Sequence, residues 1–139
     1  MANYYANWRT NYFRVKSIEA FEKSLEPIPG IQLIGNHDTM RVLLVPADIS
    51  DGGGFPSAYM SEDSEDWIEF EFSTLVKDHL VDDEVAILVE AGSEKLRYLM
   101  GYAIAVNSKG EVRSVGLNDI FNHMEELTNK PDEVTRPEY

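Results

Sequence analysis

The chain has 139 residues, a formal net charge of −13 at pH 7, a hydrophobic fraction of 43% and no cysteine. This length fits one domain with its own core, and the lack of cysteine excludes disulfides, thiol catalysis and thiolate metal sites. No apolar run approaches the ~20 residues of a membrane helix, and the N-terminus lacks the pattern of a secretion signal. We therefore expect a cytoplasmic protein that does not contact membranes.

Acidic residues are concentrated in the middle third of the sequence. Residues 47–90 contain thirteen of the 25 acidic residues, with Lys77 as the single cation. Carboxylates packed so densely repel one another and cost stability. A purely structural explanation therefore has to account for the absence of interleaved lysines.

The N-terminal half predicts a strand, a helix and a hairpin. Residues 11–16 alternate, with Phe13 and Val15 facing inward, which is typical of a half-buried strand. Ser17 is then a helix N-cap, because apolar residues follow it at spacings of three and four. Two strand-like runs, 31–34 and 40–45, flank a polar turn.

The acidic region predicts a loop followed by a strand and a helix. Residues 48–64 contain three consecutive glycines and no period, which indicates a long surface loop that is either functional or mobile. Residues 67–72 then alternate and predict a strand with Trp67, Glu69 and Glu71 on one face. A short helix is expected to begin at residue 73 or 74.

The longest apolar pattern, residues 84–115, predicts the strands around which the fold is organised. Residues 96–106 are apolar on both faces, as in a central strand, and Gly110 suits the turn of a hairpin that continues to Val115. Gly101, Ala103 and Ala105 would leave room for a helix to pack on that face. A last helix is expected after Asn118.

Together these elements predict an α+β fold, with a mostly antiparallel sheet and helices packed on one face. We expect a single domain over residues 1–128 and a flexible polar tail over residues 129–139.

The sequence shows no recognised catalytic or metal-binding motif. The three histidines have no ligand spacing, and the glycines at 52–54 lack the lysine of a phosphate-binding loop. We therefore expect no catalytic residue, no metal and no cofactor, and we favour a non-enzymatic role.

Two segments resemble a known group of proteins. Residues 9–16 (RTNYFRVK) and 94–98 (EKLRY), with 101–103 (GYA) and 107–110 (NSKG) after them, are similar to uncharacterised small acidic proteins of bacteria and of their phages and plasmids. The resemblance implies a setting on a mobile element, where small acidic proteins often inhibit host-defence nucleases. It assigns no site residues.

The leading hypothesis is an acidic binding protein, such as a DNA mimic of the anti-restriction or anti-CRISPR type. Carboxylates two residues apart on a strand face are ~7 Å apart, similar to successive phosphates. Its partner would be the basic nucleic-acid-binding site of another protein, and it would not bind duplex DNA itself. The predicted partner-binding residues are Asp48, Asp51, Glu62, Asp63, Glu65, Asp66, Trp67, Glu69 and Glu71.

Three alternatives stay open. The carboxylates could serve solubility alone. The chain could be a small-molecule or metal-binding enzyme that uses the 48–64 loop with His37 or His79 as a base. It could also bind single-stranded nucleic acid through its N-terminus, where aromatic and basic residues are mixed: Tyr4, Tyr5, Trp8, Arg9 and Arg14.

Overall fold

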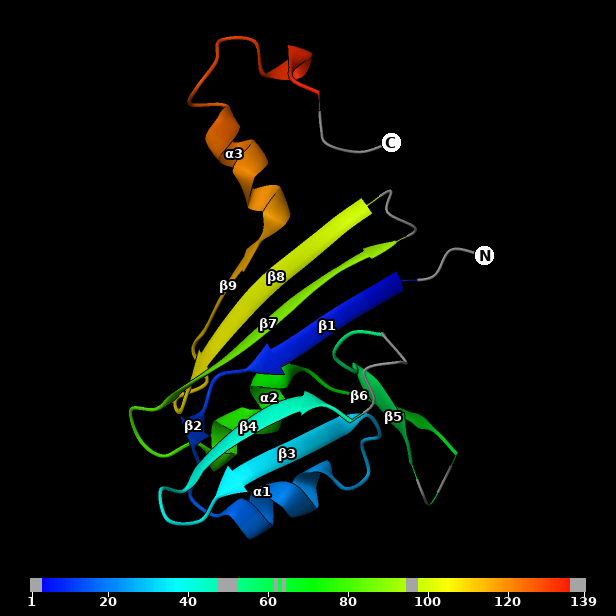
Figure 1. Cartoon of the computed structure of the whole chain (residues 1–139), viewed down its shortest axis with the longest axis vertical. Coiled ribbons are helices and arrows are strands. Elements are labelled where there is room, and N and C mark those ends of the chain that lie inside the picture. The colour runs from blue at the N-terminus through cyan, green and yellow to red at the C-terminus, as the bar shows by residue number, and fades with distance from the viewer. Residues whose placement is uncertain (1–3, 48–52, 62, 64, 95–97, 136–139) are drawn as a thin grey trace.

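The computed structural model describes residues 4–47, 53–61, 63, 65–94 and 98–135. It contains a long four-stranded sheet, ordered β1-β7-β8-β9, and a three-stranded sheet, ordered β2-β4-β3, with every adjacent pair antiparallel (Figure 1). A separate hairpin consists of β5 and β6. The α+β class and the mostly antiparallel pairing are therefore confirmed.

The elements follow in chain order. In the first half, the structure has β1 (Tyr4–Thr10), β2 (Phe13–Arg14), α1 (Ile18–Leu25), β3 (Ile31–Asn36), β4 (Arg41–Pro46), β5 (Ala58–Met60) and β6 (Trp67–Glu69). In the second half, it has α2 (Phe72–Val76), β7 (Val85–Glu94), β8 (Tyr98–Asn107), β9 (Val112–Gly116) and α3 (Ile120–Met124). Short 3₁₀ turns lie at Lys77–His79, Leu117–Asp119 and Pro131–Glu133.

The two main sheets are joined where β1 leads into β2. The buried backbone N–H of Leu44 in β4 donates to the Thr10 hydroxyl (2.9 Å), and that hydroxyl donates to the Asn11 carbonyl (2.9 Å). The Asn11 side chain accepts from the N–H of Ile87 (2.8 Å) and donates to the carbonyl of Val85 (3.1 Å). Side chains of residues 10 and 11 therefore satisfy strand donors and acceptors in both sheets.

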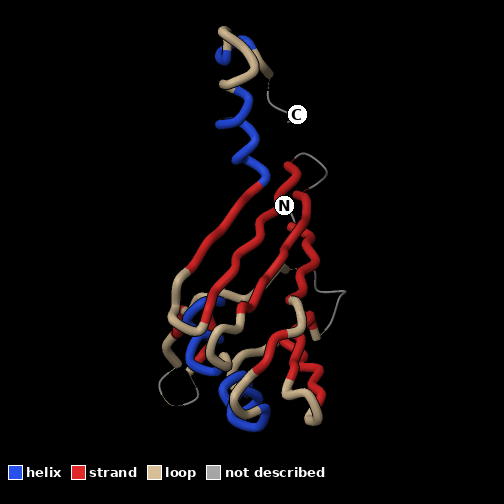
Figure 2. The backbone as a smooth tube through the Cα atoms, turned by 90° about the vertical axis from the view of Figure 1, so that its left-hand side faces the viewer, coloured by secondary structure: helices blue, strands red, loops and turns tan. Residues whose placement is uncertain are grey.

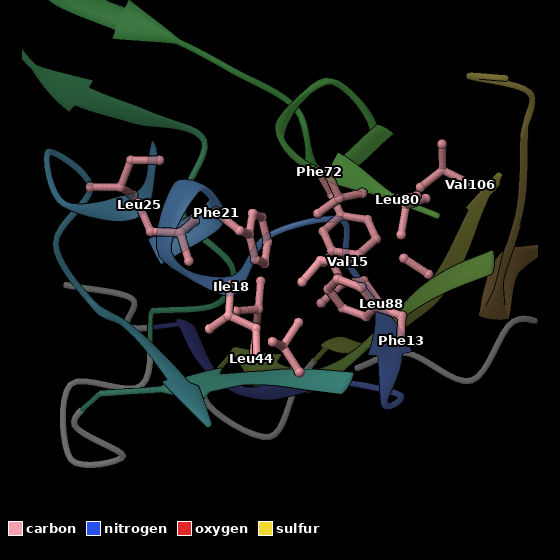
Figure 3. Packing of buried hydrophobic residues seen from close by; sticks show 14 of the residues in the cluster. Phe13, Val15, Ile18, Phe21, Leu25, Leu44, Phe72, Leu80, Leu88 and Val106 are labelled. Atoms are coloured by element: carbon pink, nitrogen blue, oxygen red, sulfur yellow. The ribbon is translucent and has the colours of Figure 1, made fainter. Parts of the chain in front are cut away.

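The two main sheets, α1 and α2 pack around one apolar core. Phe13, Ile18, Phe21, Val76 and Leu88 are buried there, and Phe13 meets Phe21 edge to face with ring centroids 5.9 Å apart (Figure 3). These residues come from β2, α1, α2 and β7. Helices α1 and α2 thus contribute to the same core, as the predicted packing on one face requires.

Several local predictions are confirmed. Ser17 is the N-cap of α1, and its hydroxyl accepts from the N–H of Ala20 (3.2 Å). β3 and β4 pair as a hairpin, β8 lies between β7 and β9, and Gly110 has a φ of 86° in the turn after β8.

Other local predictions are wrong. The expected 48–64 loop contains β5, and residues 48–52, 62 and 64 of it lie outside the described residues. The strand expected over 67–72 ends at Glu69, because the chain turns into α2 at Phe72. β1 was not predicted at all, since its polar and aromatic residues obscure the alternation.

The last helix does not pack inward. In the two views, α3 stands beyond the end of the four-stranded sheet (Figures 1 and 2). None of its residues is buried, and Ile120 is 60% exposed. On the face of β8 that carries Gly101, Ala103 and Ala105, the described structure places Leu117 of the 3₁₀ turn near Gly101 rather than α3, and an added Cβ on Gly101 would lie 3.1 Å from the Leu117 side chain. Among the described residues, no helix is long and apolar enough to cross a membrane.

The junction yields a first prediction. Thr10→Val keeps the shape of a 2% exposed side chain but leaves the buried Leu44 N–H without an acceptor. We expect the free energy of unfolding to fall by about 1–3 kcal/mol in urea titrations. Thr10→Ser, which keeps the hydroxyl, is the control and should lose less. Equal losses in the two variants would mean that the hydroxyl does not join the sheets.

Candidate protein-binding surface

The acidic region forms a hairpin that projects from the body of the fold. β5 and β6 pair through Ala58–Glu69, Tyr59–Ile68 and Met60–Trp67, and the N–H of Ser61 donates to the Asp66 carbonyl (2.8 Å) to close the turn (Figure 1). We call residues 58–71 the acidic hairpin. Trp67 lies on it with 67% of its surface exposed.

The structure places the predicted partner-binding residues as follows. The acidic hairpin brings together the exposed residues Asp63, Glu65, Asp66, Trp67, Glu69 and Glu71, whereas Asp48, Asp51 and Glu62 lie outside the described residues. Within the part of the chain that the structure describes, ion pairs join only His37 to Glu19 and Lys130 to Glu133. The described carboxylates of the hairpin are therefore available to an external cation.

The expected ladder of carboxylates along one strand is not formed. Glu69 is the last residue of β6, and Glu71 lies at the start of α2, where its N–H donates to the Thr74 hydroxyl (3.2 Å). The carboxylates instead cluster around the turn and the end of the hairpin. The predicted strand that would carry both carboxylates therefore ends before Glu71, and the role of these carboxylates in binding a partner stays a prediction.

An aromatic cluster fixes the base of the acidic hairpin. Phe55 meets Trp8 edge to face (ring centroids 4.9 Å apart), Phe72 (5.6 Å) and Phe70 (6.3 Å), and Tyr59 stacks obliquely on Phe70 (5.8 Å). Edge-to-face pairs at these distances are favourable. The hairpin is thereby held against the inner face of β1.

A buried carboxylate also holds this base. Glu90, in β7, is 7% exposed, and its Oε1 accepts from the Phe55 N–H (2.5 Å) and from the Tyr102 hydroxyl (3.3 Å). Gly54, with a φ of 82°, passes so close that an added Cβ would lie 3.0 Å from both carboxylate oxygens. Sequence reasoning missed Glu90 as a structural residue, although its position after the inward-facing Ala86 and Leu88 could have revealed it.

A second prediction follows from this contact. Glu90→Leu removes the acceptor of the Phe55 N–H, while Glu90→Gln keeps a side-chain oxygen. We expect amide hydrogen exchange over residues 53–61 and 65–70 to accelerate about tenfold or more in Glu90→Leu. The exchange should change little in Glu90→Gln. Unchanged exchange in the leucine variant would show that the aromatic cluster alone holds the hairpin.

The histidines do not form a common site. His37 is exposed and lies 3.6 Å from Glu19, His123 is exposed on α3, and the His79 ring lies against Phe21 (5.0 Å between centroids). Among the residues described, no group of three or more His, Asp or Glu side chains is arranged to hold a metal ion. The described part of the 48–64 loop contributes to the packed base of the hairpin, through Phe55, and to β5.

His79 gives a third prediction. Burial lowers its pKa below the usual 6.5, the nearby Asp78 carboxylate opposes this, and Lys16 adds to the decrease. As pH falls, His79 therefore binds a proton in the unfolded chain before it does so in the folded chain. The stability that the neutral imidazole contributes to the folded state is fully present above pH 6.5 and is lost as pH falls through the lower folded pKa.

Melting temperatures of the wild type and of His79→Gln are measured between about pH 7.5 and pH 5. As pH falls, the melting temperature of the variant should decrease less than that of the wild type. Parallel curves would contradict the burial of the neutral imidazole.

The aromatic N-terminus is divided between two faces of the sheet. Trp8 is 5% exposed and faces the core. Tyr5 and Arg9 alternate with it on the opposite face and are exposed, and Arg14 lies in β2. The structure therefore does not assemble Trp8 with Tyr5 and Arg9 into one stacking surface.

Comparison of the chain with protein families, with curated proteins and with solved structures finds no match.

Proposed function

We propose that the protein is an acidic binding protein that inserts its acidic hairpin into a basic site of a partner protein, of the kind that otherwise holds nucleic acid. The observation that carries the proposal is the exposed Trp67 among exposed carboxylates that form none of the ion pairs found between described residues. Such a site would be lined by lysine and arginine.

The exposed Trp67 favours a role in docking to a protein over a role in solubility alone. Tryptophan is enriched among the residues that dominate binding energy, and Met60 opposite it in the register is also exposed. A purely solubilising segment would gain nothing from an exposed indole on a hairpin braced by a buried aromatic cluster. The fixed base also reduces the ordering cost of binding.

The charge supports a nucleic-acid-binding site as the target. A chain at −13 with its carboxylates on a protruding hairpin would be steered toward a strongly basic cleft, and the rate of association would fall with ionic strength. The resemblance to small acidic proteins of mobile elements points to the same kind of partner, a host-defence nuclease.

Capture experiments test this proposal. The immobilised wild type, at about 0.1 M salt, should retain proteins from a bacterial lysate that duplex DNA then releases by competition. A hairpin variant combining Asp63→Asn, Glu65→Gln, Asp66→Asn and Glu69→Gln should retain them at least about tenfold less. Trp67→Ala, which leaves the charge unchanged, should also weaken retention.

The matched control neutralises four exposed carboxylates outside the acidic hairpin, in α1 or just after α1 and α3: Glu22→Gln, Glu26→Gln, Glu125→Gln and Glu126→Gln. It changes the net charge by the same amount and should keep its partners. An equal loss of retained proteins in the two quadruple variants would show that retention depends on net charge alone and not on the acidic hairpin. Bound proteins that duplex DNA does not displace would contradict the DNA-mimic mode.

A further inference from the structure

The four-stranded sheet has a second surface that the proposed function does not use. Its outer face carries the alternate residues Val85, Ile87 and Val89 of β7, which are 42%, 36% and 49% exposed. Leu99, Val115, Leu117 and Tyr5 extend the same face and are each more than half exposed. We call this surface the outer sheet face.

The exposed apolar area of this face is as large as the largest apolar patches on ordinary monomers. These seven side chains expose roughly 600 Å² together, which is at the upper limit of the largest apolar patch on typical monomers. A standard protein interface buries roughly 800 Å² on each partner. The seven side chains therefore supply roughly three quarters of the area that one side of a standard interface buries, and the alanines and flanking arginines of the outer sheet face add to it.

The shape of the outer sheet face is complementary to that of a second copy. β7 presents a ridge of Val85, Ile87 and Val89, and the neighbouring β8 presents a trough of Ala103 and Ala105. Ile87 is the cross-strand partner of Ala105, and Val89 is the partner of Ala103. A twofold axis parallel to the strands, between β7 and β8, would place the ridge of each copy in the trough of the other.

Charge favours a second copy at this face. By the strand alternation, the outward positions of β1, β7, β8 and β9 include no carboxylate among the described residues 5–9, 85–93, 99–106 and 112–116, and Glu111 lies at the edge of the face, beside Val85, Ala105 and Arg113. Arg9 and Arg113 lie on the two flanking strands and so at the rim, where solvent screens them. In a chain with a net charge of −13, the centre of this face lets two copies approach without opposing carboxylates, and Glu111 stays at the edge next to Arg113.

We propose that the protein forms a homodimer by face-to-face packing of the outer sheet face, with Val89 of one copy over Ala103 of its partner. The contact is isologous, and the sheets pack about 10 Å apart with nearly aligned strands. It is independent of the acidic hairpin, whose base lies on the opposite, inner face through Trp8 and Phe55.

Sedimentation equilibrium tests the assembly. The wild type should have twice the 15.8 kDa chain mass at concentrations of about 10–100 μM. Val89→Glu places two unpaired charges in the contact and should raise the dissociation constant at least about 100-fold. Ile34→Glu, which alters an exposed aliphatic residue of β3 outside this face, should stay dimeric, and so should the quadruple hairpin variant.

Cross-linking tests the register without relying on a destabilising charge. The natural chain has no cysteine, so a mixture of Val89→Cys and Ala103→Cys chains should give a mixed dimer with a short bifunctional thiol reagent. A mixture of Ile34→Cys and Ala103→Cys chains should not.

A wild type that stays monomeric, or a dimer indifferent to Val89→Glu, would overturn the proposal. Binding of such a monomer to single-stranded oligonucleotides or anionic vesicles through this face would identify a different occupant.

Discussion

The arrangement depends on the junction at Thr10 and Asn11. A single N-terminal segment belongs to both main sheets, as β1 in the long one and as β2 in the short one. At the point where it changes sheets, two side chains replace the missing ladder bonds, to Leu44 on one side and to Val85 and Ile87 on the other. The sheets therefore share one core, although few strand-to-strand hydrogen bonds connect them.

Because the two sheets share one core, their inner and outer faces have different properties. The inner faces of the sheets meet α1 and α2 over the core, and the base of the acidic hairpin packs against the same side through Phe55. Among the described residues, the centre of the outer sheet face is apolar and exposed, with Arg9 and Arg113 at its rim. The carboxylates of the acidic hairpin thus project from one part of the fold, while the apolar centre of the outer sheet face lies on another. The two proposed contacts, with a basic partner and with a second copy, use different residues.

Part of this structure could be predicted from the sequence, because the signals were local. Alternation placed Phe13 and Val15 in the core, the N-cap propensity of Ser17 located α1, and Gly110 located the β8–β9 turn. The exposure of the hairpin carboxylates followed from composition. These features need only the spacing of neighbours along the chain.

The remaining features depend on contacts between residues far apart in sequence. Glu90 stabilises the hairpin through Phe55, 35 residues away, and Thr10 reaches Leu44, 34 residues away. Glycine and alanine in β8 suggested a helix on that face, but small residues also form a trough for a sheet. Leu127, which follows α3, is 87% exposed, and no residue of α3 is buried.

Native-state amide hydrogen exchange is the most direct measurement of the central claim, that the junction unites the two sheets in one cooperative core. The account predicts that amides in β4 and β7 exchange with the same unfolding free energy, whereas amides at the tip of the acidic hairpin exchange much faster. A β4 that opens at a distinctly lower free energy than β7 would show two separate units and would contradict the account.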